Sequence, residues 1–298
     1  MTHLISKKAL GLVAMGLAAW VPLASAQADP AGQGRLVTAI QTYQGATNEG
    51  RAMAAIELRR ALAAGKSAPA ATRAEATFLL SDYAMRERKK DLALKQAEEG
   101  LKLLGGLQAG EAAAVRALGA RVKAQALLAK QERLAALKLM VDARLAYGAQ
   151  KPQANAKWDK VWDELFLWVY IAYAELRGSE KKEGTDLLNA RQAEFDLIGK
   201  MEGSCENQND PLIIVNRESN LPAYPIAPMF EGQAGGVFLR LSLNPEGGVT
   251  QATATAFSTS EDFAILAERA AANWVATGKG LEQPACRAER PALVVFKY

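Results

Sequence analysis

Residues 235–257 read GGVFLRLSLNPEGGVTQATATAF, and this stretch decides how the C-terminal part of the chain folds. Its first half alternates like a strand with one buried face, because polar Arg240 and Ser242 stand between the apolar residues Val237, Leu239, Leu241 and Leu243. Turn-forming residues fill 244–248, and the threonine-rich run 249–257 suits a second strand. The stretch therefore predicts a β-hairpin.

The residues that follow predict a helix and a last strand. Ser260 is placed to cap a helix, with Glu261 and Asp262 in the first turn, where the helix dipole favours negative charge. Apolar residues then recur at spacings of three and four, and we expect this stripe to lie across the sheet: Phe263, Leu266, Ala267, Ala270, Ala271 and Trp274. We expect the helix to end at Trp274. The run 293–298 then completes a β-β-α-β unit as a strand at the sheet edge.

Glycine, aromatic and small residues stand in a fixed order around this unit: Tyr224, Pro225, Ala227, Gly232, Gly235, Gly236, Val237, Gly247, Gly248, Val249, Ala270, Ala271 and Trp274. In this order they resemble the C-terminal domain of TonB, a protein-binding domain, over residues 221–298. The resemblance implies that Tyr224, Pro225, Gly235, Gly236, Val237, Gly248 and Trp274 are structural residues. It also implies that the domain binds a protein and carries out no catalysis.

Residues 1–26 predict a signal peptide that is cleaved on secretion to the periplasm. Lys7 and Lys8 precede the apolar stretch 9–23, and Ala24-Ser25-Ala26 forms the cleavage site. The alternative is a leader that is kept as an inner-membrane anchor, and only then would the protein contact a membrane. We favour cleavage, because the apolar stretch is shorter than the roughly 20 residues that a membrane-spanning helix prefers.

Cleavage would remove His3, the only histidine of the chain. The mature protein would then have no imidazole for general-base catalysis or for a histidine-rich metal site. The formal net charge of +4 falls to about +2 when the two leader lysines are lost, so a nucleic-acid partner is not expected. The sequence therefore predicts no cofactor and no metal.

Two cysteines, Cys205 and Cys286, remain in the mature chain. In an oxidising compartment an isolated pair predicts one disulfide, which would tie the segment before the C-terminal module to its last strand. Such a bond would contribute about 4 kcal/mol in the chain-entropy model. The alternative is a pair of buried free thiols.

Residues 27–202 predict a helical-repeat domain, followed by a linker at 203–220 and the TonB-like domain at 221–298. We expect helices at 91–104, 111–129, 132–147, 155–176 and 180–200, and a further one that opens after Pro69. Helix pairs that recur at roughly 40 residues resemble a tetratricopeptide-like solenoid. The predicted fold class is therefore α+β.

One predicted helix carries an unusual number of aromatic residues: Trp158, Trp162, Phe166, Trp168, Tyr170 and Tyr173. They form either an exposed aromatic groove for a peptide or glycan, or the buried side chains of a helix that is packed on both faces. We favour the buried helix.

We expect a non-enzymatic protein that binds a partner chain by adding it as a strand to an open sheet edge. The expected docking residues form the last strand: Leu293, Val294, Val295 and Phe296. The resemblance to TonB implies a partner in the cell envelope, such as a segment of an outer-membrane receptor. The alternative is an energy transducer that couples inner-membrane energy to outer-membrane transport and keeps its leader as an anchor. That role needs a long proline-rich spacer, and a helical region stands in its place.

The alternative of an enzyme depends on carboxylate residues that could act in catalysis. The candidates are Glu98, Glu99, Asp159, Asp163, Glu261 and Asp262. Each falls on a predicted helix surface or first turn, where charged residues are expected without any catalytic role. No catalytic residue is therefore predicted.

Overall fold

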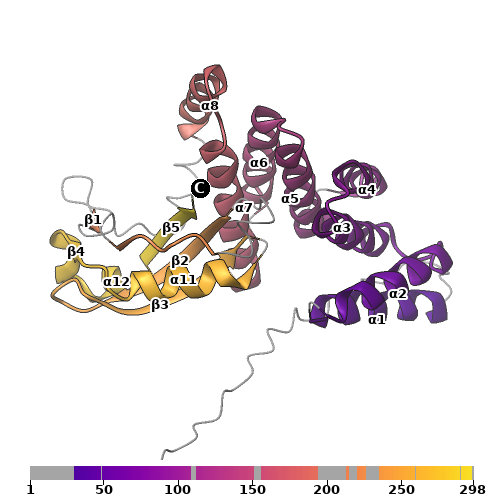
Figure 1. Ribbon diagram of the computed structural model, residues 1–298, viewed down its shortest axis with the longest axis horizontal. Helices are drawn as coiled ribbons and strands as arrows, with labels where there is room; N and C mark the ends of the chain where they lie inside the picture. The colour runs from indigo at the N-terminus through magenta and orange to yellow at the C-terminus, as the bar shows by residue number, and fades with distance from the viewer. Residues whose placement is uncertain are drawn as a thin grey trace, which may run out of the picture.

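The computed structural model describes residues 30–47, 49–108, 112–150, 156–193, 213–214, 220–225, 235–258, 260–288 and 290–296. Helices make up the N-terminal part of the chain, and an antiparallel sheet with its own helix makes up the C-terminal part (Figure 1). The predicted α+β fold class is confirmed.

The helical part consists of α1 (Pro30–Gly45), α2 (Arg51–Ala64), α3 (Ala70–Arg86), α4 (Lys90–Leu103), α5 (Ala113–Ala129), α6 (Arg133–Gly148), α7 (Ala156–Ala174) and α8 (Ser179–Ala190). The predicted helices match α3 to α7 closely, whereas the helix predicted at 180–200 corresponds to α8, which already ends at Ala190. Residues 194–200 of the last predicted helix lie outside the described residues.

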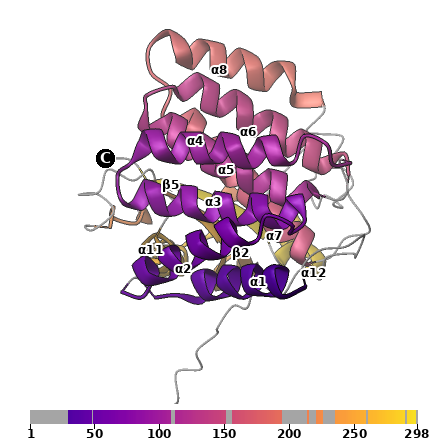
Figure 2. The same ribbon diagram turned by 90° about the vertical axis from the view of Figure 1, so that its right-hand side faces the viewer.

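The helices pack as successive pairs, and α1, α3, α5 and α7 also stack on one another (Figure 2). The turns inside three of the pairs share one feature, a residue in the left-handed region: Arg88 (φ 57°), Gln131 (φ 68°) and Gly178 (φ 54°). In the first two turns, the next residue donates its N–H to a carbonyl five residues back, Lys89 to Ala84 at 2.8 Å and Glu132 to Leu127 at 2.9 Å. This recurring turn supports the repeat architecture.

A single aromatic ring sets the spacing between three of these helices. Phe78 of α3 is fully buried, and it faces a glycine on each of its two neighbours. A methyl group at Gly100 of α4 would lie 2.3 Å from the ring, and one at Gly119 of α5 would lie 2.4 Å from it. Both positions therefore need glycine because the ring approaches the backbone closely.

The C-terminal sheet contains β2 (Gly235–Leu243), β3 (Val249–Phe257) and β5 (Arg290–Phe296) in the order β3-β2-β5, with all pairs antiparallel. Helix α11 (Glu261–Ala271) connects β3 to the later elements, and the Ser260 hydroxyl caps it by accepting a hydrogen bond from the Asp262 N–H. The predicted β-β-α-β unit and its cap are confirmed. At the tip of the hairpin, Gly247 adopts a φ of 87°, which favours glycine.

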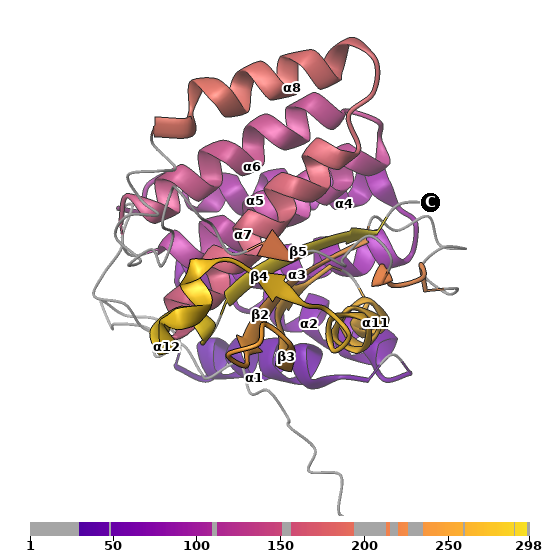
Figure 3. The same cartoon turned by 90° about the vertical axis from the view of Figure 1, so that its left-hand side faces the viewer.

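The helix ends three residues earlier than the sequence predicts, at Ala271 instead of Trp274. The reason is that the chain turns away from the helix there to meet the hairpin, where the Trp274 carbonyl accepts a hydrogen bond from the Val249 N–H at 3.2 Å. The next elements, β4 (Ala276–Thr277), the 3-10 turn η3 (Lys279–Glu282) and α12 (Pro284–Arg287), were not predicted. Strand β4 pairs with β1 (Ile213–Ile214), which comes from within the predicted linker (Figure 3).

Helices α11 and α7 cover the two faces of the sheet. Val237, Leu239 and Leu241 of β2 pack with α11, as the sequence predicts, whereas Phe238 packs into the core of the helical part with α7. Methyl groups at Gly235 and Gly236 would lie 2.2 Å from Phe263 of α11 and 2.7 Å from Leu167 of α7. The prediction that β2 buries only one face was therefore wrong, because α7 covers the other.

Candidate functional site

Among the strands that the structure describes, β3 and β5 are the terminal ones of the sheet, and an added strand would have to join one of them. On β3, the Glu268 side chain of α11 accepts a hydrogen bond from the Ala254 N–H at 2.7 Å. The pairing of β3 with β2 also shifts register at two points. Such bulges and side-chain caps interrupt the regular backbone spacing that an added strand needs. β3 is therefore the less suitable edge.

Strand β5 contains the four predicted docking residues, and their side chains belong to the core. Val294 and Phe296 are buried on the α11 side, whereas Leu293 and Val295 are half-buried. Leu293 packs against the core that contains α7. The side chains of these residues therefore hold the sheet together, so the backbone is the part of β5 that could take a partner strand.

The direction of the β5 backbone groups follows from its partner strand. The Gly236 carbonyl accepts a hydrogen bond from the Ser258 N–H at 2.9 Å, so the backbone groups of Gly236 face β3. Those of the next residue, Val237, then face β5 and its register partner Val294. The backbone groups of Val295, one residue further, consequently point toward the outer edge.

The position of Pro291 supports the outward orientation of the Val295 backbone groups. Pro291 is the second residue of β5 and pairs in register with Arg240. Proline has no N–H, so within sheets it is confined to edge strands, strand starts and bulges. Pro291 lies four residues before Val295 and thus has the same outward orientation.

The residues that carry the TonB resemblance build the core of the module. The Tyr224 ring lies edge-on to Phe263 of α11 and Phe296 of β5, with ring centroids 5.4 and 5.9 Å apart. Trp274 is 1% exposed and donates its indole N–H to the Asn220 carbonyl at 3.2 Å. Pro225, Gly235, Gly236 and Val237 are also buried, and Gly248 is half-buried. These residues therefore lie in or beside the core of the module, and the structural role that the resemblance implies for them stays a prediction.

A buried ion pair joins α7 to the sheet. Asp163 of α7 is 3% exposed and accepts hydrogen bonds from the Arg240 guanidinium of β2 at 2.7 and 3.3 Å. It accepts another from the Thr255 hydroxyl of β3 at 2.9 Å. Three hydrogen bonds from Arg240 and Thr255 therefore hold this carboxylate between α7 and the sheet.

The aromatic residues of α7 are largely buried, as we expected. Trp162 and Trp168 lie in the core, and Phe166 packs edge-on against Phe238 of the sheet at 5.4 Å. The Arg144 guanidinium of α6 stacks between Trp162 and Phe166, 4.1 and 4.2 Å from their centroids. Tyr170 is 39% exposed, and the side chain of Trp158 lies outside the described residues. A continuous exposed aromatic groove is therefore absent from the described part of α7.

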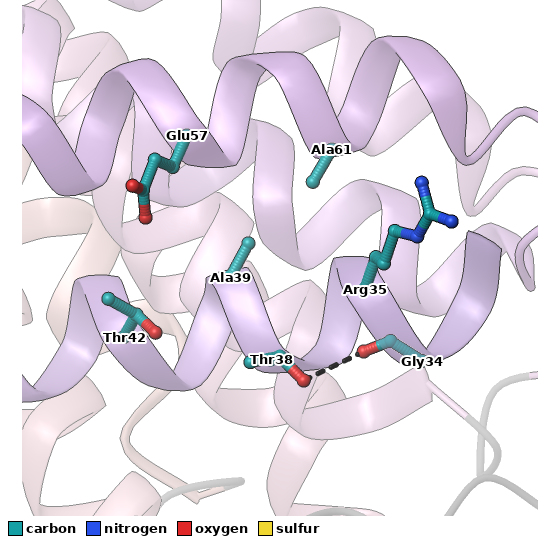
Figure 4. A pocket seen from close by; sticks show the side chains of 7 residues that line it. All are labelled: Gly34, Arg35, Thr38, Ala39, Thr42, Glu57 and Ala61. Carbon is teal, nitrogen blue, oxygen red and sulfur yellow. Dashed lines mark hydrogen bonds between the residues drawn. The ribbon is translucent and has the colours of Figure 1, made fainter. Parts of the chain in front are cut away.

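A shallow groove of about 450 Å³ runs between α1 and α2 on the outer side of the first helix pair (Figure 4). Its floor consists of small residues, and its walls carry two opposite charges, Arg35 on α1 and Glu57 on α2. These two side chains lie toward opposite ends of the groove and do not meet in Figure 4. No pattern in the sequence predicted this groove, because it forms only when the two helices pair.

The remaining carboxylates that the sequence singled out lie on helix surfaces. Glu98 pairs with Lys123 at 3.0 Å and Glu99 with Lys95 at 4.0 Å, and Glu261 and Asp262 are exposed at the start of α11. The side chain of Asp159 lies outside the described residues. Within the described ranges, no three metal-binding side chains come together.

Among the described tyrosines, Tyr43 of α1 has the most altered acidity. Its ring is 3% exposed, and burial raises the pKa of its hydroxyl far above the usual value, with a further contribution from the Asp82 carboxylate. Tyr43 is therefore protonated throughout the neutral range and serves as a core residue of the first helix pair.

Several predictions concern residues that the structure does not describe. The signal peptide at 1–26, Ala227, Gly232 and Cys205 all lie outside the described residues. Cys286 is buried beside the sheet, and its disulfide to Cys205 stays a prediction. No helix of the described part is both long and apolar enough to cross a membrane.

The comparisons with known proteins give no match. No protein-family model matches the chain, no curated protein is significantly similar to it, and no solved structure matches its fold. The class of protein is therefore defined by its architecture, a helical-repeat-like region joined to a small antiparallel β domain.

Proposed function

We propose that this chain is a periplasmic, non-enzymatic interaction protein with a TonB-like C-terminal domain that binds a partner chain by strand addition at β5. The observation that carries the proposal is the asymmetry of the sheet edges. Glu268 and two register shifts obstruct β3, whereas β5 is a terminal strand whose Val295 backbone groups point outward. The partner would be an extended segment of a cell-envelope protein, such as an outer-membrane receptor.

Backbone hydrogen bonds supply the affinity in this mode of binding, and each contributes about 1 kcal/mol net. The rigidity of the edge supports the proposal, because β5 is fixed on both faces, by Phe296 against α11 and by Leu293 against the α7 core. A partner strand would therefore find an edge that is already ordered, which lowers the entropic cost of binding.

The hydrogen bonds and ion pairs of the carboxylates support a protein that is not an enzyme. Asp163 is held by Arg240 and Thr255, and Glu98 and Glu99 form surface ion pairs. The helical part would then act as a scaffold that holds the β domain.

Removal of one outward N–H tests the docking edge. Val295→Pro should remove a hydrogen-bond donor at the outer edge and keep the pairing with β2, whereas Val295→Thr keeps the donor and serves as the matched control. We expect an envelope partner captured by the wild-type protein and by Val295→Thr to bind Val295→Pro at least fivefold more weakly, the equivalent of one hydrogen bond. Circular dichroism must show that both variants are folded.

A second measurement is independent of the proline. Amide exchange on the wild-type protein should show new protection at Val295 when the captured partner is added, and no change at Thr253 of β3. Equal recovery of partners by the two variants, or protection that appears on β3 instead, would show that β5 is not the docking edge.

A further inference from the structure

The two ends of the helical stack differ in the character of their outer faces. At the C-terminal end, α8 exposes polar residues such as Lys182, Glu183 and Asp186, as a terminal repeat needs for solubility. At the N-terminal end, α2 exposes two large apolar side chains, Met53 at 61% and Ile56 at 37%. The first helix pair therefore exposes large apolar side chains beside its charged ones, such as Arg35 and Glu57.

The exposed apolar residues and the α1–α2 groove belong to one surface. Ile56 and Glu57 lie three and four residues after Met53 on α2, so each of them neighbours Met53 on the helix surface, and Glu57 also lines the groove. The groove floor contains Gly34, Ala39 and Ala61, whose small size lets another helix approach closely (Figure 4). We call this surface, formed by Met53, Ile56 and the residues that line the groove, the N-terminal face.

The charges on the N-terminal face are self-complementary. Arg35 and Glu57 stand toward opposite ends of the groove, one on each helix, and no ion pair or hydrogen bond of either side chain is present in the described part of the chain. A two-fold axis through the middle of the groove would bring Arg35 of each copy opposite Glu57 of the other. Isologous interfaces have this symmetry, in which each pairing occurs twice.

We infer that the N-terminal face binds the same face of a second copy of this chain around a two-fold axis. Two reciprocal Arg35–Glu57 pairs orient the copies, and Met53 and Ile56 are buried between them. The dimer would carry two copies of the β domain, so a partner with two binding segments would gain avidity. The inference does not depend on which edge of the sheet binds that partner.

The size of the face sets the strength of the dimer. A helix of 16 residues, such as α1, is about 24 Å long, and two adjacent helices are about 20 Å wide, so each copy offers about 480 Å². The buried total of about 1,000 Å² lies at the lower end for specific interfaces, where transient complexes are found, so we expect a weak dimer with a dissociation constant on the order of 10–100 µM.

Charge reversal provides the test. In Arg35→Glu alone or Glu57→Arg alone, both reciprocal contacts become repulsive, and we expect each variant to dimerise about thirtyfold more weakly than the wild type. In an equimolar mixture of the two variants, both contacts are again attractive, so a heterodimer should form with near wild-type affinity. Sedimentation velocity on the full chain between 10 and 500 µM measures all four samples.

Three outcomes would speak against the proposed dimer. A wild-type protein that stays monomeric at 500 µM, single variants that dimerise as the wild type does, or a mixture without heterodimer would each overturn the inference. Thermal unfolding of the two variants should match the wild type at 1 µM, where the chain is monomeric. In addition, Ile56→Lys should weaken the dimer without changing that unfolding temperature, because Ile56 is exposed in the monomer.

Discussion

Replacement of Asp163 by alanine should show that the helical part and the sheet unfold as one unit. The Asp163 carboxylate accepts two hydrogen bonds from Arg240 and one from Thr255, and these two partners lie on β2 and β3. Alanine removes all three bonds and leaves a guanidinium without its counter-ion at the junction.

The magnitude follows from the burial of the two partners. Loss of one member of a buried ion pair costs about 3–5 kcal/mol. Arg240 keeps 29% of its side-chain surface exposed and can recover some hydration, so we expect a loss near the lower value, about 3 kcal/mol. The matched control is Asp142→Ala, which breaks a surface pair with Arg191 at 3.1 Å. The Asp142 side chain is 68% exposed, and its removal should cost less than about 1 kcal/mol.

Urea unfolding at low protein concentration measures both variants. Far-UV circular dichroism follows the helices, and tryptophan fluorescence follows Trp162 and Trp168 of α7 together with Trp274 of the β domain. Because α7 contributes to both parts, we expect the two signals to shift together in Asp163→Ala. A loss below 1 kcal/mol, or a shift of only one signal, would refute the reasoning. The double variant Asp163→Leu with Arg240→Met should recover most of the stability, since an apolar pair needs no counter-ion.

Two further predictions concern the helical part. Gly119→Ala should destabilise the protein by about 2 kcal/mol, because its methyl group would lie 2.4 Å from the Phe78 ring. A methyl group at Gly45 would meet nothing within 4 Å, so Gly45→Ala is the control and should have no such effect in the same urea titration. The second prediction concerns Tyr43, because burial raises the pKa of its hydroxyl in the folded protein. Above about pH 10, the unfolded chain loses the Tyr43 proton while the folded chain keeps it. The free energy of unfolding should therefore fall by up to about 1.4 kcal/mol per pH unit. Tyr43→Phe should make this alkaline fall shallower, and an unchanged pH profile would contradict the assigned pKa.

Local sequence patterns predicted the elements well where one element carries its own signal. The alternation in 235–243, the cap at Ser260 and the apolar stripe from Phe263 onward depend on neighbours within a few residues, and each appears in the structure. The exception is the end of α11, where Trp274 lies beyond the helix and its carbonyl accepts a backbone hydrogen bond from Val249. That contact joins two segments, and a pattern within one of them does not contain it.

The sequence predicted the candidate docking strand β5 as an element. It did not predict that β5 is a more suitable edge for a partner strand than β3. The sequence predicts a final strand at a sheet edge, and β5 is a terminal strand. The obstruction of the other edge by Glu268 became visible only in three dimensions, because this residue reads in the sequence as one more charged position on a helix. The N-terminal face likewise became visible only in three dimensions, because Arg35 and Glu57 are separate surface charges until α1 and α2 pair.

The sequence by itself determined helices α3 to α8 and the β-β-α-β unit, because periodicity, capping and turn residues act over short distances along the chain. Only the tertiary structure decided what covers each face. Arg240 and Phe238 occupy the face of β2 that the alternation assigns to solvent, and α7 covers that face through Asp163, 77 residues away. Periodicity shows which face of an element is apolar, but burial depends on which distant segment packs against it, and this packing is a property of the whole fold.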